Sequence, residues 1–308
     1  MNEKTLKYIV KRFLLAILTL FIVIAITFFV MHAIPASPFS SEKAKSDAVI
    51  AALEAKYGFD KPIGVQFVNY LIGVLHFDFG LSTAWVGHTV FDLIKGAFKY
   101  SAIVGLSAAL IAIVFGVIFG CLSALRRGKW LDKVLQVVTT ALVSMPSFVM
   151  ATLLLYAFGL KWKILPTIGS SKGGLILPIF SLSLSPMAYI TRLMRSSMLD
   201  VLGQDYIRTA RAKGLSNFKV IFKHAMKNAL GPVITYAGPM IAGILTGSMV
   251  VENIFSVPGL GRLFTNAMLK TDYMMIMGVT IFLATLVIIM NFISDILYKV
   301  VDPRIDLE

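Results

Sequence analysis

Residues 13–31 read FLLAILTLFIVIAITFFVM, nineteen successive residues without a charged side chain. A helix needs about 20 predominantly apolar residues to cross the hydrocarbon core of a bilayer. The apolar stretch of a secretory signal peptide is shorter, about 7 to 15 residues. Pro35 and Pro38 also crowd the position at which such a peptide would be cleaved. We therefore expect a retained membrane helix here.

Five further apolar runs follow, and the chain as a whole is predicted to be an all-α polytopic membrane protein with six transmembrane helices. Composition agrees, because 57% of the 308 residues are hydrophobic and 15% are charged, against about 25% charged residues in ordinary soluble domains. A soluble enzyme, a disordered chain and a disulfide scaffold are excluded. The lone cysteine, Cys121, is expected to be a buried small hydrophobe. The six runs cover residues 13–31, 100–125, 134–160, 175–194, 232–251 and 275–301.

The net charge of +13 is carried in short blocks between the apolar runs. Lys and Arg gather before the first run, at 126–133, at 192–227 and after the last run. The positive-inside rule places these blocks and both termini in the cytoplasm, in a multi-pass protein of the cell (inner or plasma) membrane. A nucleic-acid partner is not expected, because that requires one continuous basic surface.

This topology divides the chain into four parts. They are a cytoplasmic N-terminus with the first helix at 1–31, an external region at 32–95, a membrane domain of five helices at 96–300, and a cytoplasmic C-terminus at 301–308. Apolar positions at helical spacing predict short amphipathic helices at 49–56 and 65–75 in the external region. They either cap the membrane part or help to receive a partner protein.

The sequence carries no motif for chemistry of its own. The text nearest to a nucleotide-binding P-loop, at 128–130, lacks the required earlier glycine and the following hydroxyl. We expect no catalytic residue, no metal site and no cofactor bound by this chain. The centres of the predicted spans also lack acids and histidines, which an ion-coupled carrier usually keeps at mid-membrane.

Hydroxyl groups are the polar side chains of the spans. They either donate to carbonyls of their own helices or line an uncharged pathway through the membrane, and both interpretations stay open. The pathway candidates are Ser144, Ser147, Ser185, Tyr236, Thr246 and Ser248.

Small residues recur at every fourth position in two of the runs. Ala112, Gly116 and Gly120 form one series, and Gly243 and Gly247 form the other. Small side chains let membrane helices approach closely. We expect close helix contacts there, either within the chain or with a second subunit.

The cytoplasmic loop at 195–230 is long enough to have its own role, and it contains DYIRTARAKGL at residues 205–215. Asp205 is expected to cap a helix that runs through Lys213, and Gly214 suits the following position, where φ is positive. Ser216 is expected to cap a second helix. The apolar stripe of that helix is predicted to be Phe218, Ile221, Phe222 and Ala225.

A helix, a glycine corner and a second helix are therefore predicted for this loop. Such a corner presents cations and the small residues Ala210 and Ala212 to the cytoplasm. Arg208 and Arg211, three residues apart, share a face of the first helix and suit acidic groups on a partner.

The loop resembles the EAA loop of the permeases of binding-protein-dependent ABC importers. Arg208, Thr209 and Ala210 stand at the E-A-A positions, and Gly214 matches the glycine four residues on. Residues 205–215 match the version of the dipeptide/oligopeptide branch, D-Y-[IV]-R-T-A-R-A-K-G-L, throughout. We call residues 195–230 the coupling loop.

The resemblance to this branch extends along nearly the whole chain. Residues 223–232 fit the segment that follows the glycine and depart mainly at Met226. The external region is similar to that of the B-type permease subunit rather than its C-type partner. Other similar stretches lie at 55–62, 78–82, 247–261 and 302–305.

The resemblance implies a type I ABC importer permease fold with an external insertion after the first helix. It implies a permease subunit, not an enzyme, that forms half of the translocation pathway for oligopeptides or dipeptides. The expected partners are a homologous second permease, two ABC ATPases that bind ATP and Mg, an extracellular solute-binding protein, the peptide and the lipid membrane. The residues expected to couple to an ATPase are Asp205, Arg208, Thr209, Ala210, Arg211, Ala212, Gly214 and Leu215.

Two other functions stay open. The same scaffold is compatible with import of nickel, a metal chelate or a glycoside, because the motifs do not identify the cargo. A stand-alone ion-coupled carrier belongs to another class, and the missing mid-membrane acids argue against it.

Overall fold

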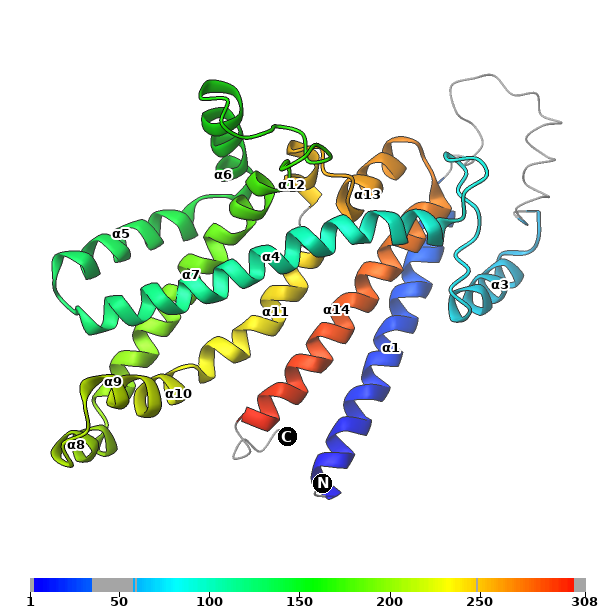
Figure 1. Cartoon of the computed structure of the whole chain (residues 1–308). Coiled ribbons are helices and arrows are strands. Elements are labelled where there is room, and N and C mark those ends of the chain that lie inside the picture. The colour runs from blue at the N-terminus through cyan, green and yellow to red at the C-terminus, as the bar shows by residue number, and fades with distance from the viewer. Residues whose placement is uncertain (1–2, 35–57, 59, 248, 302–308) are drawn as a thin grey trace. The chain divides into compact units, whose positions relative to one another are not determined.

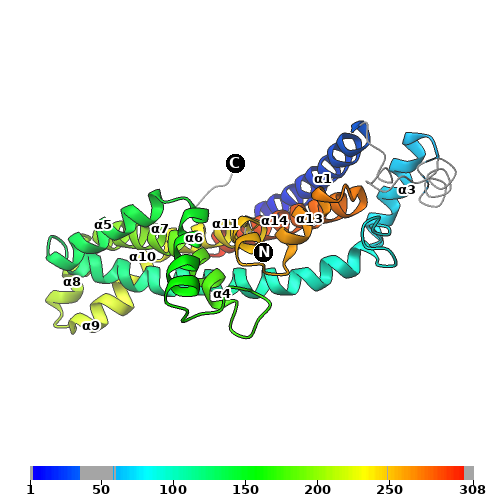
Figure 2. The same ribbon diagram turned by 90° about the horizontal axis from the view of Figure 1, so that it is seen from above.

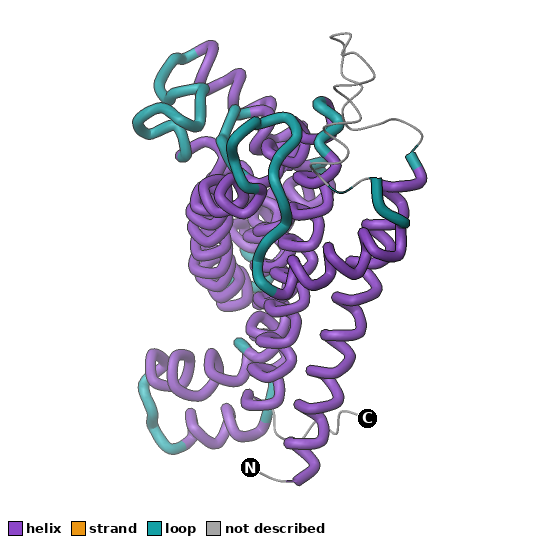
Figure 3. The backbone as a smooth tube through the Cα atoms, turned by 90° about the vertical axis from the view of Figure 1, so that its right-hand side faces the viewer, coloured by secondary structure: helices purple, strands orange, loops and turns teal. Residues whose placement is uncertain are grey.

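Helix accounts for most of the backbone in the computed structural model, which describes residues 3–34, 58, 60–247 and 249–301 (Figure 3). No β-strand occurs in these residues, and Leu81 and Thr89 form an isolated antiparallel bridge. The chain forms two units. Unit 1 is Met1–Ser101 with Pro258–Ile289, and unit 2 is Ala102–Val257 with Met290–Glu308. The predicted all-α class is confirmed.

Unit 1 is built around a long apolar helix, α1, that lies beside α14 (Figures 1 and 2). The ring of Phe28 in α1 packs against Phe67 and Tyr70 of α3, with centroid distances of 5.3 and 5.8 Å. The amphipathic helix predicted at 65–75 is thus confirmed as α3, whereas the one at 49–56 lies outside the described residues. The elements are α1 (Glu3–Ala33), α3 (Ile63–Leu75), the first turns of α4 (Val90–Leu125), α13 (Leu260–Leu269) and most of α14 (Tyr273–Val301).

A buried carboxylate ties the loop before α4 to the turn between α13 and α14. Asp272 has no exposed surface. Its Oδ2 accepts hydrogen bonds from Ser82 Oγ at 2.5 Å and from the N–H of Ala84 at 3.1 Å. Its Oδ1 accepts from the N–H of Met275 at 3.1 Å. Because these bonds replace those that water would make, the charge is tolerated inside unit 1.

Unit 2 contains the coupling loop and most of the polar hydroxyls. α7 is its central helix, and α4, α5, α6 and α11 contact it (Figure 1). The elements are the rest of α4, α5 (Trp130–Ser144), α6 (Ser147–Leu154), η1 (Leu155–Lys161), α7 (Ile176–Leu202), α8 (Asp205–Ala212), α9 (Asn217–Lys219), η2 (Val220–Ala225), α10 (Met226–Ala229), α11 (Gly231–Gly247), α12 (Met249–Ile254) and the end of α14.

The small residues of α4 bring that helix close to α7. A Cβ atom at Gly116 would lie 2.7 Å from the Cβ of Ile190, and one at Gly120 would lie 2.6 Å from the Cβ of Met194. The predicted close contact is therefore confirmed for this series, and it lies within the chain. At Gly243 a Cβ would meet no atom within 4 Å, so this glycine does not make such a contact inside the described chain.

Four helices are long and apolar enough to cross a membrane, and two further spans are bent pairs of helices. The four are Tyr8–Ala33, Val90–Leu125, Ile176–Leu202 and Tyr273–Ser294. The pairs are Trp130–Ser144 with Ser147–Lys161, bent by 106°, and Asn217–Ala229 with Gly231–Leu245, bent by 50°. Six candidate spans result if each bent pair counts as one. In the second pair, Gly231–Leu245 covers most of the run predicted at 232–251, whereas Asn217–Ala229 belongs to the coupling loop.

The third span is not the single continuous helix that was predicted over 134–160. α5 ends at Ser144, and Met145 has an extended backbone with φ −87° and ψ 126°. Pro146 follows and precedes the first residue of α6. The ring of a proline disfavours helical backbone in the residue before it, and this breaks the helix.

Candidate functional site

The corner of the coupling loop forms around Gly214, as predicted. The N–H of Gly214 donates to the carbonyl of Arg211 at 2.9 Å, and the N–H of Leu215 donates to the carbonyl of Ala210 at 3.4 Å. This pair of bonds closes the end of α8 in a Schellman motif, which needs a residue with positive φ. Gly214 has φ +75°, and a Cβ there would meet no atom within 4 Å. A side chain at position 214 would therefore strain the backbone by about 1 kcal/mol but would not clash with any neighbouring atom.

The first turn of α8 differs from the prediction in its cap. Gln204 is the N-cap, with no side-chain cap hydrogen bond, and Asp205 is already the first helical residue. At this position the positive end of the helix dipole still stabilises the negative charge of Asp205. Asp205 lies 3.6 Å from Arg208 in a pair that is exposed on both sides. Thr209 Oγ1 donates to the carbonyl of Asp205 at 3.0 Å, so this hydroxyl is hydrogen-bonded within α8.

The second limb begins at Ser216 as predicted, but it does not keep α-helical spacing. Ser216 Oγ accepts from the N–H of Lys219 at 3.4 Å. The chain then widens into the π-helix η2, which buries Val220 and Ala225, five residues apart. The α-helical spacing predicted for the stripe of Phe218, Ile221, Phe222 and Ala225 is therefore wrong, because the π-turn shifts the buried face.

Phe218 and Phe222 instead form an exposed aromatic pair on the coupling loop. Their rings lie 4.4 Å apart, and the side chains are 69% and 52% exposed. Lys219 and Lys223 are exposed next to them along the chain. The surface thus offers an apolar patch with cations beside it, a combination typical of contact surfaces.

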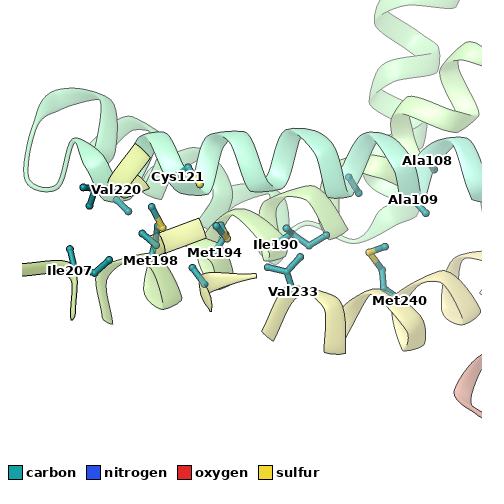
Figure 4. Close-up of a cluster of buried hydrophobic side chains, with 14 of the residues drawn as sticks. Ala108, Ala109, Cys121, Ile190, Met194, Met198, Ile207, Val220, Val233 and Met240 are labelled. Atoms are coloured by element: carbon teal, nitrogen blue, oxygen red, sulfur yellow. The ribbon is translucent and has the colours of Figure 1, made fainter. Parts of the chain in front are cut away.

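The coupling loop is fixed to the membrane helices by a continuous apolar core. Figure 4 shows this cluster along α4, α7 and α11, and it extends to Ile207 and Val220 of the loop. Ile207, Val220 and Met198 of α7 are fully buried. Burial of one such side chain stabilises by about 1.5 to 3 kcal/mol, so the corner and α7 are expected to move together.

One predicted contact residue belongs to this core. Ala210 is 7% exposed and packs in the cluster, so the prediction that it is presented to the cytoplasm is wrong. Leu215 is half-buried against the same cluster. Ala212, Arg208 and Arg211 are exposed and remain available to a partner.

A side-chain hydrogen bond joins the two limbs across the corner. Asn228 Nδ2 donates to Tyr206 Oη at 2.8 Å. α8 and α9 lie together at one end of unit 2 (Figures 1 and 2). The bond and the apolar core hold them there as one knob, α8 to α10, rather than as a loose loop.

An ion pair with a buried carboxylate links the first turn of α5 to α7, and the sequence did not reveal it. Arg195 Nε and Nη2 donate to the two carboxylate oxygens of Asp132 at 2.7 and 2.9 Å. Ser123 Oγ donates to Asp132 at 2.5 Å, and the N–H of Gly128 donates at 2.9 Å. Asp132 is 1% exposed. Such a satisfied pair fixes α7 seven residues before its last residue, Leu202.

A cleft between α7 and α11 brings together three of the predicted pathway residues. Ser147, Ser185 and Tyr236 line a space of about 410 Å³. The volume falls within the range of small-molecule sites, about 300 to 1,000 Å³. The other lining residues are Ser181, Leu182, Pro186, Pro239, Met240, Gly243 and Ile244.

The remaining hydroxyls are placed differently. Ser144 is exposed at the end of α5 and does not line the cleft, while the side chains of Thr246 and Ser248 lie outside the described residues. Ser183 Oγ donates to the carbonyl of Phe180 at 2.8 Å, so this hydroxyl is hydrogen-bonded within α7. The interpretation as a backbone-bonded hydroxyl therefore holds for Ser183, while the pathway interpretation stays a prediction for the hydroxyls that line the cleft.

Ser181 is a cleft residue that the sequence did not single out as a pathway candidate. It is 3% exposed, and its Oγ has no hydrogen-bond partner within the described chain. An unpaired buried hydroxyl is costly, by about 1 to 3 kcal/mol. Sequence alone does not identify it, since Ser183, two residues away, has the same chemistry and a partner.

Family models match most of the chain. Residues 112–307 match the binding-protein-dependent transport system inner membrane component. Residues 5–90 match the N-terminal membrane component of the same kind of transport system.

Curated relatives are similar over nearly the full length. The dipeptide transport system permease protein DppB of Bacillus subtilis (strain 168) is 43% identical over 302 residues, which are 98% of each chain. The oligopeptide transport system permease protein OppB of Haemophilus influenzae is 45% identical over 304 residues, 97% of this chain and 99% of that protein.

Solved structures share the fold at low sequence identity. A chain of the MetNI methionine ABC transporter in an inward-facing conformation superposes with a TM-score of 0.56 at 17% identity, over 68% of this chain and 96% of the other. An amino acid ABC transporter gives a TM-score of 0.52 at 16% identity, over 70% of this chain and 94% of the other.

Proposed function

Because the chain belongs to the family of binding-protein-dependent transport system inner membrane components, we propose that it imports dipeptides or oligopeptides as half of an ATP-driven translocation pathway. It is a multi-pass membrane permease subunit and not an enzyme. The observation that supports the cargo class is the sequence identity of 43% and 45%, over nearly the whole chain, to permeases named for dipeptide and oligopeptide transport.

The knob formed by α8 to α10 supports a mechanical role for this chain. The apolar core joins it to α7, and the Schellman corner at Gly214 makes it rigid. A rigid element transmits a displacement because packed helices move as units. ATP hydrolysis on a separate subunit would therefore reach the membrane helices through this knob.

The exposed chemistry of the knob suggests how an ATPase subunit would hold it. Arg208 and Arg211 would pair with acidic side chains of the ATPase. The Phe218 and Phe222 pair would enter an apolar groove of the same subunit. Asp205, Thr209 and Gly214 would act through the shape of α8, while Ala210 and Leu215 would anchor the knob from inside.

The partners and the orientation belong to the same proposal. Two ATPases with ATP and Mg would bind on the cytoplasmic side, a homologous second permease would complete the pathway, and an extracellular solute-binding protein would deliver the peptide. In unit 2 a Cβ at Gly238 of α11 would overlap Ser294 of α14. The last turns of α14 therefore pack against the middle of α11; a cytoplasmic C-terminus is the position that the basic bias of the loops favours. With six spans, an even number, the N-terminus would lie on the same side of the cell membrane.

The test is reconstitution of the whole assembly in proteoliposomes, with a panel of cargos. ATP-dependent uptake of labelled dipeptides and oligopeptides, above that of nickel or a glycoside, is the expected result. Selective uptake of nickel, a metal chelate or a glycoside would replace the peptide assignment while keeping the permease role. Uptake by this chain alone, driven by an ion gradient, would refute the role of a permease subunit.

A further inference from the structure

The cleft between α7 and α11 contains a hydroxyl without a partner and a helix carbonyl that lacks its usual helix donor. Ser181 Oγ is buried in its wall without a partner in the described residues. Pro186 lies inside α7 and has no N–H, so the helix lacks its usual donor for the carbonyl of Leu182. Leu182 also lines the cleft. Buried acceptors of this kind are normally paired, and a ligand with N–H groups would pair them.

The lining carries no charge. Serines, a tyrosine, prolines, a glycine and aliphatic side chains surround the space, and no Asp, Glu, Lys, Arg or His is among the lining residues. A neutral wall neither attracts nor repels a cargo whose side-chain charges vary. It therefore suits a ligand that is recognised through groups common to all its members.

The apolar part of the wall is adaptable. Met240 is an unbranched, polarizable side chain that adjusts to irregular surfaces. Gly243 faces open space, because a Cβ there would meet no atom within 4 Å. Together they leave room for side chains of different sizes.

From these features we propose that the cleft holds the backbone of the transported peptide, whose amide N–H groups donate to Ser181 Oγ and to the carbonyl of Leu182. Every peptide residue except proline carries one N–H donor and one C=O acceptor regardless of its side chain. The hydroxyls of Ser185 and Tyr236 can both donate and accept, so they suit the peptide carbonyls. This inference rests on the proposed function and adds the place and the chemistry of cargo contact.

The test compares two tripeptides of different bulk, triglycine and trileucine, in proteoliposomes that contain the complete assembly. Ser181→Ala removes a cleft hydroxyl, and Ser183→Ala is its matched control on the same helix. Gly243→Leu fills the open space of the cleft.

Ser181→Ala is expected to slow uptake of both tripeptides by a similar factor of about three to ten, because the lost bond is to the backbone. Ser183→Ala is expected to leave both rates unchanged. Gly243→Leu is expected to slow trileucine about tenfold more than triglycine, since overpacking is felt only by the larger side chains.

Three results would overturn the proposal. Equal effects of Ser181→Ala and Ser183→Ala on uptake would show that these hydroxyls affect the structure of α7 and do not bind the peptide. Equal slowing of both tripeptides by Gly243→Leu in an assembly that still forms would show that the open space beside Gly243 does not receive the side chains of the cargo. If Gly243→Leu does not assemble, the serine pair decides alone. Failure of the unmodified assembly to import either tripeptide would instead remove the proposed function, and this inference with it.

Discussion

At the residue scale, Gly214 is predicted to matter for coupling rather than for folding. Gly214→Ala forces a side chain into φ +75° but meets no neighbouring atom, so the corner is strained by about 1 kcal/mol while the apolar anchors of the knob remain. Gly214→Asp adds a charge to the same strain. We expect both variants to insert normally, with lower peptide uptake and lower solute-stimulated ATP hydrolysis, and the aspartate variant to lose both activities.

Gly128 provides the control for that prediction. It has φ +77° and equally open surroundings, but it lies in the turn between α4 and α5. Gly128→Ala therefore imposes the same strain outside the coupling loop, and uptake is expected to stay near that of the unmodified protein. Equal losses at the two glycines would mean that strain alone, not the position of the corner, lowers activity.

The ion pair between Asp132 and Arg195 is predicted to stabilise unit 2. Arg195→Met leaves a carboxylate that is 1% exposed without its cation, which costs about 3 to 5 kcal/mol. A marked fall in the melting temperature of the purified assembly is expected. The double variant Asp132→Asn/Arg195→Met should lose less than the two single variants together, because the pair is coupled.

Arg208→Met serves as the comparison for Arg195→Met. Its pair with Asp205 is 3.6 Å long, with side chains 74% and 95% exposed, and exposed pairs contribute about 0 to 1 kcal/mol. The melting temperature should hardly change. If the melting temperature falls as far in Arg208→Met as in Arg195→Met, the effect of Arg195→Met cannot be assigned to burial of the Asp132 carboxylate.

At the scale of elements, the contact of α4 with α7 depends on the absence of a side chain at Gly120. A Cβ there would lie 2.6 Å from the Cβ of Met194 and 2.7 Å from the carbonyl of Thr191. Gly120→Ala therefore separates the helices, at a cost of about 1 to 3 kcal/mol. Gly96→Ala, in the same helix with no atom within 4 Å, should be neutral or slightly stabilising. Thermal unfolding of the purified assembly distinguishes the two, and equal shifts would contradict the packing argument.

The sequence predicts the helices better than their ends and faces. Apolar runs of bilayer length locate the spans, because membrane helices must hide their backbone polar groups internally. The break at Pro146 and the π-turn at 220–225 change direction and buried face without changing composition. They follow from local backbone geometry and from packing, so the α-helical spacing predicted for the stripe through Phe218 was wrong, whereas the glycine corner at 214 was right.

The candidate site shows the same division. A glycine with positive φ and a serine cap leave local signals, and both were found in the coupling loop. Contacts between distant segments leave none, so the Asp132–Arg195 pair and the burial of Ala210 were missed. The cleft combines the two cases, since Ser185 and Tyr236 were chosen for their hydroxyls but the unpaired state of Ser181 depends on how α7 and α11 pack.

At the scale of the whole molecule, the proposed topology makes a prediction for reporter fusions. Fusions after Asp60 and Gly169 should report an external position, and those after Lys129 and Lys213 a cytoplasmic one, because basic segments stay inside. Within unit 2 the N–H of Gly169 donates to the carbonyl of Phe255 at 2.6 Å, which agrees with one external side for both loops. A cytoplasmic signal after Asp60 would contradict the six-span topology.

The division of labour across the assembly follows from what this chain contains. It has a cleft without charged lining residues, a rigid knob and no P-loop motif in its sequence. Transport against a concentration gradient needs free energy. Because this chain has no P-loop motif, that free energy comes from another subunit. The permease role and the energy source can therefore be tested together.

The most direct measurement is accumulation of a labelled peptide in proteoliposomes that contain the complete assembly, with the peptide-loaded binding protein on one side and ATP on the other. The account predicts accumulation above the outside concentration with ATP, none with a non-hydrolysable analogue, and none when Gly214→Asp replaces the native chain. Accumulation that persists without ATP hydrolysis, or that follows an imposed proton gradient, would contradict it.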